Sequence, residues 1–190
     1  MKSWCTFFAK TILKAGLSTL VVTLASCSPG SGQKSAGTET KTVDLQTAVM
    51  SDNLDMVKQH IASKSNLNEK EPFGGSTPLI TAAVFGKTEA AKLLIEAGAD
   101  LNIQNNDGST ALHSAAFFGR PEIVKMLLAK KADKTVRNKY GSTPLETVAG
   151  NFDDVRPVYD MMVKALGPYG LKLDYAYLQT VRPEISALLK

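Results

Sequence analysis

The stretch that decides the fold occurs three times: GSTPL at residues 75–79, GSTAL at 108–112 and GSTPL at 141–145. Successive copies begin 33 residues apart, and segment 75–107 aligns with segment 108–140 without gaps at 14 identical positions. Self-similarity at a fixed period of this length is typical of repeat arrays, in which each unit buries its apolar face against its neighbours. We therefore expect a stack of similar units.

Within one unit the sequence predicts two helices. Gly108 turns the chain, Thr110 can cap a first helix, and Gly119 ends that helix. A second helix is expected from Pro121 to about Lys130, because apolar residues recur there at helical spacing. Its apolar stripe consists of Ile123, Val124, Leu127 and Leu128. Each unit is thus a helix–turn–helix followed by a loop that leads to the next glycine.

These units resemble the ankyrin repeat family, whose pattern is roughly Gly-x-Thr-Pro-Leu-His-x-Ala-Ala, a glycine, an amphipathic helix and Gly-Ala-Asp-x-Asn. The matching residues in 75–107 are Thr77, Pro78, Leu79, Ala82, Ala83, Gly86, Gly98, Ala99, Asp100 and Asn102. Those in 108–140 are Thr110, Leu112, His113, Ala115, Ala116, Gly119, Ala132 and Asp133. The departures are Ile80 and Glu146 for the histidine, Lys131 for the glycine and Thr135 for the asparagine. The resemblance implies an all-α ankyrin repeat solenoid of about four helix–turn–helix units, with short hairpin-like loops and an atypical C-terminal helical cap.

The flanking units are less regular than the two central repeats, 75–107 and 108–140. Residues 42–74 fit a degenerate first repeat, whose second helix matches that of the next repeat at an offset of 34. One extra residue is therefore expected in the loop around 71–75. Residues 141–190 are expected to form a fourth repeat with an extended cap, since terminal repeats must cover an open face of the stack.

Two further helices are predicted in this last segment. Val155–Leu166 has apolar residues on one helical face, and Asp153 with Asp154 is expected to cap that helix. The sequence Arg-Pro-Glu-Ile at 182–185 resembles the start of the second helix in the third repeat, at 120–123. Another helix is therefore expected to end the chain.

The N-terminal residues indicate export from the cell. Residues 1–26 carry three lysines and no acidic residue, and their apolar run, Ala15–Ala25, is shorter than the ~20 residues that span a bilayer. The run ends in Leu-Ala-Ser-Cys at 24–27, which resembles the bacterial lipoprotein box with Ser in the usual Gly or Ala position. A cleaved signal with a chance cysteine and an uncleaved membrane anchor are the alternatives.

The resemblance to lipoproteins implies a signal peptide at 1–26, lipidation of Cys27 as the first mature residue, and a flexible linker over the rest of 27–41. The linker has no large apolar residue to bury. Ser28 is compatible with the outer membrane, because the usual signal for inner-membrane retention is Asp at that position. The expected localisation is therefore a lipid anchor in a bacterial membrane, the outer membrane facing the periplasm.

Charge and cysteine content restrict the function classes. The 190-residue chain has a net charge of +4, and removal of 1–26 with its three lysines leaves +1 (4 − 3). This charge is too small to propose nucleic acid as a partner. The two cysteines, Cys5 and Cys27, argue against a disulfide framework, because the expected cleavage removes the first and the expected lipid caps the second.

The chain has two histidines, His60 and His113. His113 occupies the turn position at which ankyrin repeats carry a structural histidine, and His60 falls on a helix of the first repeat. Metal-ligand spacings, a nucleophile elbow and a phosphate loop are missing from the sequence. We therefore expect no enzyme, no catalytic residue, no metal, no cofactor and no small-molecule substrate. An enzyme whose activity resides in 155–190 is the remaining alternative.

A protein-binding surface is what remains. The family places it on the loop tips and on the exposed side of the first helices, and large aromatic and Arg side chains there are typical of binding hot spots. The candidate partner-binding residues are Phe73, Phe85, Gln104, Asn106, Asp107, Phe117, Phe118, Arg137, Lys139 and Tyr140. For Phe117 and Phe118, packing on the neighbouring repeat accounts for the aromatic side chain equally well.

The expected function is a non-enzymatic, membrane-tethered periplasmic module that binds a protein, of unknown identity, and protects, positions or inhibits it. The alternative is an immunity lipoprotein that neutralises a secreted antibacterial effector. Both functions require the same kind of binding surface, so the sequence does not separate them.

Overall fold

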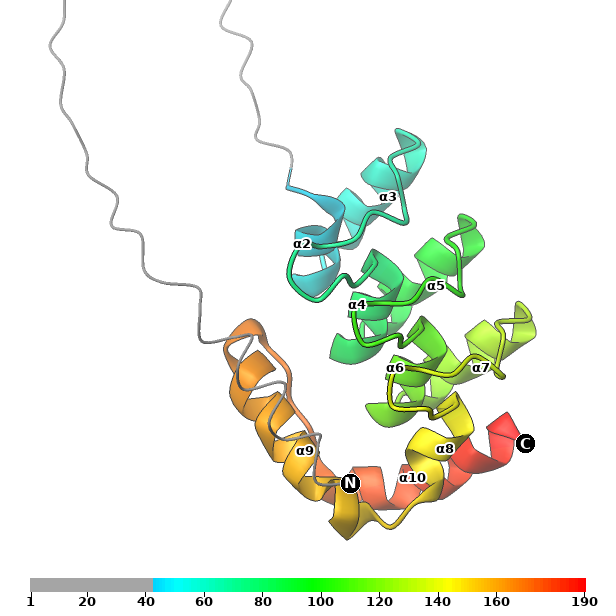
Figure 1. The fold of residues 1–190 in the computed structure, drawn as a ribbon. Helices are drawn as coiled ribbons and strands as arrows, with labels where there is room; N and C mark the ends of the chain where they lie inside the picture. The colour runs from blue at the N-terminus through cyan, green and yellow to red at the C-terminus, as the bar shows by residue number, and fades with distance from the viewer. Residues whose placement is uncertain (1–42) are drawn as a thin grey trace, which may run out of the picture. The chain divides into compact units, whose positions relative to one another are not determined.

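Short helices in antiparallel pairs make up residues 43–190, the part of the chain that the computed structural model describes (Figure 1). The first helices of the pairs, called inner helices here, are α2 (Leu45–Met50), α4 (Pro78–Phe85), α6 (Ala111–Phe117) and α8 (Pro144–Ala149). The outer helices that follow the first three are α3 (Leu54–Ala62), α5 (Thr88–Glu96) and α7 (Pro121–Ala129). The predicted signal peptide, Cys27 and linker lie outside the described residues.

The chain ends with α9 (Phe152–Leu166), the short 3₁₀ helix η1 (Gly167–Tyr169) and α10 (Tyr175–Leu189). Residues 43–190 contain no strand, so the expected all-α class is confirmed. In Figure 1 the inner helices α2, α4 and α6 form one row and the outer helices α3, α5 and α7 form another. Helix α10 closes the end of the stack, and α9 turns away from that end.

Recurring caps explain where the inner helices begin and end. The side chains of Thr77, Thr110 and Thr143 accept a hydrogen bond from the backbone N–H three residues later, at the starts of α4, α6 and α8. Gly86 and Gly119 follow α4 and α6 with φ of 68° and 67°, in the left-handed region that glycine adopts without strain. The repeated Gly-Ser-Thr signal therefore predicts the local structure correctly.

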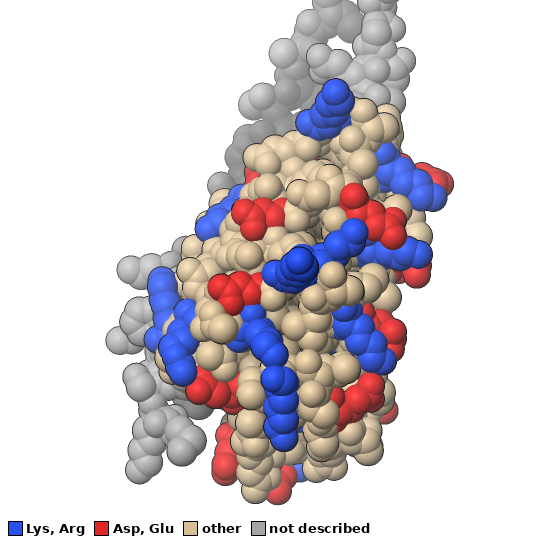
Figure 2. Space-filling view, turned by 90° about the vertical axis from the view of Figure 1, so that its right-hand side faces the viewer, with Lys and Arg blue, Asp and Glu red and all other residues tan. Residues whose placement is uncertain are grey.

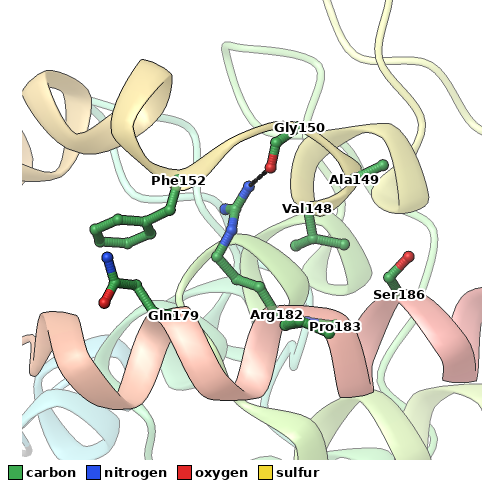
Figure 3. Close-up of a pocket in the computed structure, with 8 residues that line it drawn as sticks. All are labelled: Val148, Ala149, Gly150, Phe152, Gln179, Arg182, Pro183 and Ser186. Atoms are coloured by element: carbon green, nitrogen blue, oxygen red, sulfur yellow. Dashed lines mark hydrogen bonds between the residues drawn. The ribbon is translucent and has the colours of Figure 1, made fainter.

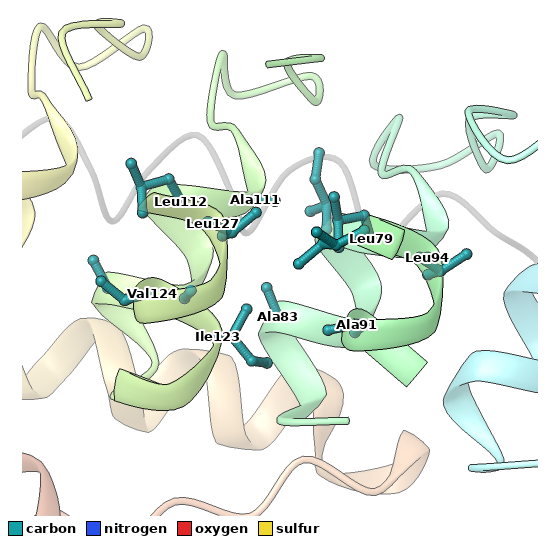
Figure 4. Close-up of a cluster of buried hydrophobic side chains, with 14 of the residues drawn as sticks. Leu79, Ala83, Ala91, Leu94, Ala111, Leu112, Ile123, Val124 and Leu127 are labelled. Carbon is teal, nitrogen blue, oxygen red and sulfur yellow. The ribbon is translucent and has the colours of Figure 1, made fainter. Parts of the chain in front are cut away.

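Small residues allow the helix pairs to stack closely. Ala82 and Ala83 of α4, like Ala115 and Ala116 of α6, have no exposed surface. The larger side chains of α5 and α7 fill the space between successive pairs, where they point into a shared core (Figure 4). The core runs the length of the stack, as expected for units that bury their apolar faces on each other.

The fourth repeat is interrupted. Helix α10 packs against α7 and α8, so it takes the place of an outer helix beside α8. Its residues Ile185 and Leu189 are as buried as Ile123 and Leu127 of α7, at matching steps from the Arg-Pro-Glu-Ile motif. Residues 151–181, which include α9, η1 and the start of α10, thus precede the part of α10 that matches α7, and form an insertion in this repeat.

One expectation about this insertion is wrong. The cap of α9 is Asn151, whose side chain accepts from the N–H of Asp153 at 3.1 Å. Asp153 and Asp154 lie within the first turn instead. Their negative charges are favourable there because the N-terminus of a helix is electropositive.

Candidate protein-binding surface

Three hairpin-like loops, called fingers here, project from the starts of successive repeats. In each finger the backbone N–H at its base donates to the carbonyl of a serine, across Glu71–Ser76, Asn105–Ser109 and Asn138–Ser142, at 2.9–3.0 Å. A side chain then holds the turn from inside. The Oδ1 atom of Asn138, for example, accepts from the N–H of Tyr140 at 3.0 Å and of Ser142 at 3.1 Å.

The same role falls to Asn105 in the second finger and to the carboxylate of Glu71 in the first. These three residues are not among the candidates predicted from the sequence. The signal was available for two of them, because Asn105 and Asn138 are 33 residues apart and identical in the repeat alignment. Glu71 aligns with Asn105 at the offset of 34, but its residue type differs, so identity in the repeat alignment does not reveal it.

Successive fingers are joined at their tips by backbone hydrogen bonds. The N–H of Asn106 donates to the carbonyl of Gly74 at 2.8 Å, and the N–H of Lys139 donates to that of Asp107 at 2.9 Å. The side-chain amide of Asn106 also donates to the carbonyl of Phe73 at 3.0 Å. The tips therefore form one continuous row, which we call the finger row.

The finger row consists of Phe73, Asn106, Asp107, Lys139 and Tyr140. Phe73 is 83% exposed although it is apolar, and Tyr140 is 39% exposed. The hydroxyl of Tyr140 donates to the Asp107 carboxylate at 3.2 Å. Five of the candidate binding residues are thus brought together on a surface whose backbone is fixed.

The electrostatics of the row fix the direction of its side-chain hydrogen bond. Burial and the neighbouring Asp107 carboxylate raise the pKa of Tyr140 to about 12, so the phenol remains a neutral donor. Burial also raises the pKa of Asp107, while the Tyr140 hydrogen bond and the Lys139 charge oppose that rise. The row presents an aromatic ring, a phenol, an amide and a lysine side by side.

Two other loop candidates, Gln104 and Arg137, form contacts within and between the repeats. The side-chain amide of Gln104 donates to the carbonyls of Gly108 at 2.7 Å and Arg137 at 3.2 Å. The guanidinium of Arg137 forms an ion pair with Glu146 at 2.7 Å. Both side chains are exposed and lie next to the finger row, but their polar groups already hold neighbouring repeats together.

The candidates on the inner helices differ in accessibility. Phe85 and Phe117 are half-buried, and the Phe117 ring stacks on Tyr159 of α9 with a centroid distance of 4.5 Å. Phe118 is only 6% exposed and its ring packs edge-on against Phe117 at 5.1 Å. Burial therefore removes Phe118 from the surface candidates and supports the packing role for it.

His113 is a structural residue, as expected. The N–H of Thr110 donates to Nδ1 of His113 at 3.2 Å, which leaves Nε2 as the donor to the carbonyl of Ser142 at 3.0 Å. His113 thereby joins the third repeat to the third finger. Burial lowers the pKa of its imidazole, in keeping with a neutral ring.

The outer-helix face is a mixed, solvated surface. On it Lys125 forms ion pairs with Glu122 at 3.0 Å and with Glu184 at 3.4 Å, and Lys58 lies 3.9 Å from Asp55. Blue and red side chains alternate over this side of the molecule (Figure 2). Exposed pairs of this kind add little to stability and give the face no single charge.

A pocket of about 290 Å³ lies between α8 and α10 (Figure 3). The Arg182 side chain runs along it, but donates to the carbonyl of Gly150 at 3.2 Å and to the hydroxyl of Tyr159 at 2.9 Å. The guanidinium thus supports the end of α8 and the insertion. Residues 43–190 contain no cluster of His, Cys, Asp and Glu that could hold a metal ion. Nor is any helix in that range both long and apolar enough to cross a bilayer.

Comparison with known proteins agrees with this geometry. Residues 45–138 match the family described as "Ankyrin repeats (3 copies)". Among solved structures, the ankyrin repeat domain of Bcl-3, a member of the IkappaB protein family, is 30% identical with a TM-score of 0.53, over 54% of this chain and 45% of that chain. The human DNA-binding protein RFXANK is 44% identical over 50 residues, which are 26% of this chain and 19% of that protein.

The chain therefore spans less than half of either of these proteins. Ankyrin repeat domains are typically non-catalytic modules that bind other proteins. The family match and the stacked helix pairs identify the chain as an ankyrin repeat protein.

Proposed function

We propose that this chain binds a partner protein through the finger row while a lipid on Cys27 holds it at the periplasmic face of a bacterial outer membrane. In this role it protects, positions or inhibits its partner without catalysis. The observation that carries the binding part is Phe73, an apolar ring that is 83% exposed on a finger whose turn is held by three hydrogen bonds to Glu71.

A rigid, exposed aromatic residue is well suited to binding. The free energy falls when a partner covers a large apolar group that was exposed to water. A loop whose conformation is already fixed loses little conformational entropy when the partner binds. Tyr140, on the third finger, adds a second aromatic group of the type that dominates binding hot spots. We do not extend the DNA-binding role in the name of the human relative to this chain, because the match covers only 19% of that protein.

The lipid anchor rests on the sequence alone. The signal-like residues 1–26 end in a lipoprotein-type box, and the 14 residues after Cys27 are rich in small and polar types. A linker of this length and composition has a root-mean-square reach on the order of 20 Å, which would let the repeats meet a partner close to the membrane.

Binding through the finger row is tested by replacing Phe73 and Tyr140 together with Ala. The partner would first be captured from periplasmic extract with the parent protein, identified, and then titrated with purified parent and variant. We expect the double variant to unfold at nearly the parent midpoint and to bind at least tenfold more weakly, about 1.4 kcal/mol. Lys92→Ala, on the outer helix α5, is the control and should bind like the parent.

A folded double variant that binds as tightly as the parent would show that the finger row is not the interface. The anchor is tested separately by Cys27→Ser, which should abolish labelling with a fatty acid analogue and release the protein from membranes. Label retained in that variant, or no label in the parent, would refute lipidation at Cys27.

A further inference from the structure

The turns between inner and outer helices form a second edge of the stack, remote from the fingers in the repeat. Asp52, Gly86 and Gly119 occupy equivalent positions on this edge, each in the left-handed region with φ of 58°, 68° and 67°. Each turn is covered by a side chain from the next unit. The three coverings differ, and the middle one is incomplete.

At the first turn, Lys87 of the second repeat reaches back to Asp52 and forms an ion pair at 3.5 Å. At the last turn the covering is apolar, since a Cβ atom placed on Gly119 would meet Leu178 and Val181 of α10. The first turn is thus covered by an ion pair and the last turn by aliphatic side chains.

At the middle turn, Arg120 of the third repeat lies over Gly86, which has no side chain to offer. A Cβ atom on Gly86 would lie 2.8 Å from both Cζ and Nε of Arg120. The guanidinium makes one long hydrogen bond, from Nη2 to the carbonyl of Val84 at 3.4 Å. Within residues 43–190 its buried Nε has no hydrogen-bond partner and no carboxylate lies within ion-pair distance of the group.

The surroundings make this missing partner costly. Arg120 is half-buried, and burial lowers the pKa of its guanidinium, with Tyr177 acting in the opposite direction. A partly desolvated cation that lacks a counter-charge is unfavourable, and an anion that pairs with it would lower the free energy. Tyr177 on α10 is 44% exposed, so an aromatic side chain accompanies the cation at this edge.

We propose that Arg120 binds an acidic side chain of the partner protein. The carboxylate of that side chain would pair with Arg120 as the carboxylate of Asp52 pairs with Lys87. This inference rests on the proposed protein-binding function and names the chemistry of a second contact. A guanidinium fork fits a carboxylate through two parallel hydrogen bonds, here from the terminal Nη atoms, because Nε is buried over Gly86. The single positive charge matches one carboxylate, and the carbonyl oxygen of Val84 beside it disfavours a dianionic phosphate.

The structure supplies a matched pair of variants for the test. Gly86→Asp places a carboxylate beneath Arg120 on a backbone position where Asp52 already shows that aspartate fits. Gly86→Asn has the same shape without the charge. In both, the flexible end of Arg120 has to shift, so any difference between them reports the charge alone.

The probe is a capped oligoglutamate peptide, with an oligoglutamine peptide and inorganic phosphate as comparisons. The readout is the NMR signal of the Arg120 Nε–H in the full chain, identified by its loss in Arg120→Lys. We expect oligoglutamate to shift this signal saturably in the parent and in Gly86→Asn, and to leave it unchanged in Gly86→Asp. Oligoglutamine should have no effect.

No saturable shift in the parent would overturn the proposal, as would an equal response in Gly86→Asp. A response to phosphate as strong as that to oligoglutamate would also overturn the carboxylate assignment. The Phe73→Ala, Tyr140→Ala double variant should keep the Arg120 response. If that response persists while this variant binds the partner normally, the finger-row function fails and the Arg120 site stands.

Discussion

In the second and third repeats the inner helix is followed at once by its outer helix, whereas in the fourth repeat residues 150–174 intervene between α8 and α10. Despite this detour, α10 packs on α7 and α8 as an outer helix would. The position of an outer helix is therefore set by its apolar face and by its neighbours, and does not require the short turn that normally precedes it.

The regular repeats and the insertion also differ in the contacts that hold them in place. The regular repeats use recurring backbone bonds between fingers and small alanines between helices. The insertion is tied to the stack by side chains: Tyr159 donates to the carbonyl of Phe117 at 2.6 Å, and Arg182 donates to Tyr159. The regular repeats carry the finger row, so the comparison separates the region of the proposed interface from the region that closes the stack.

The largest expected effect tests whether α10 is equivalent to α7. Ile123→Ala and Ile185→Ala each remove a side chain that has no exposed surface, at matching positions of the two helices. Each should lower the free energy of unfolding by about 2–5 kcal/mol, because a cavity remains in a packed core. Urea unfolding followed by circular dichroism measures the change. A loss at Ile123 with none at Ile185 would show that α10 is a loosely attached tail.

A smaller effect is expected where the insertion meets the stack. Tyr159→Phe removes a buried hydroxyl that serves both Phe117 and Arg182, and should cost about 1–3 kcal/mol, because a carbonyl and a buried cation each lose a partner. Tyr175→Phe is the control, since its hydroxyl donates to the exposed Asp160 and should matter little. Equal unfolding midpoints for the two variants would contradict the role given to Tyr159.

The smallest expected effect is a pH dependence of the free energy of unfolding that comes from His113 in the regular region. Burial lowers the pKa of His113 from its ordinary 6.5, so the unfolded chain binds a proton more readily than the folded one. The contribution of the neutral ring is complete above about pH 6.5 and is lost as the pH falls through the lowered value. The unfolding free energy of the parent should therefore decline, as the pH falls below 6.5, more steeply than that of His113→Gln. Parallel curves would show that His113 does not titrate on unfolding.

Much of the stack could be predicted from sequence because it repeats. The 33-residue period fixes the helix pairs, the Thr caps and the finger positions, since each signal occurs more than once. The same period places Phe73, Asn106, Asp107, Lys139 and Tyr140 on neighbouring fingers, although the bonds between their tips needed coordinates.

The insertion could not be predicted in this way, because its contacts occur once. Phe118 aligns with the half-buried Phe85, yet it is buried. No repeat pattern shows that α9 brings Tyr159 against Phe117, or that Arg182 supports the end of α8. The resemblance between residues 182–185 and 120–123 predicts a further helix, and it also contains the signal that this helix completes the fourth repeat.

The central claim, that the regular region binds protein through its fingers, is tested most directly by site-specific photocrosslinking in cells. A photoreactive phenylalanine analogue would be placed at three exposed positions. Two lie in the regular region, Phe73 on the first finger and Lys92 on outer helix α5, and the third is Lys164 on inserted helix α9. We expect a discrete protein adduct from position 73 and none from 92 or 164. An adduct from position 164 with none from 73 would contradict it and place the interface on the insertion.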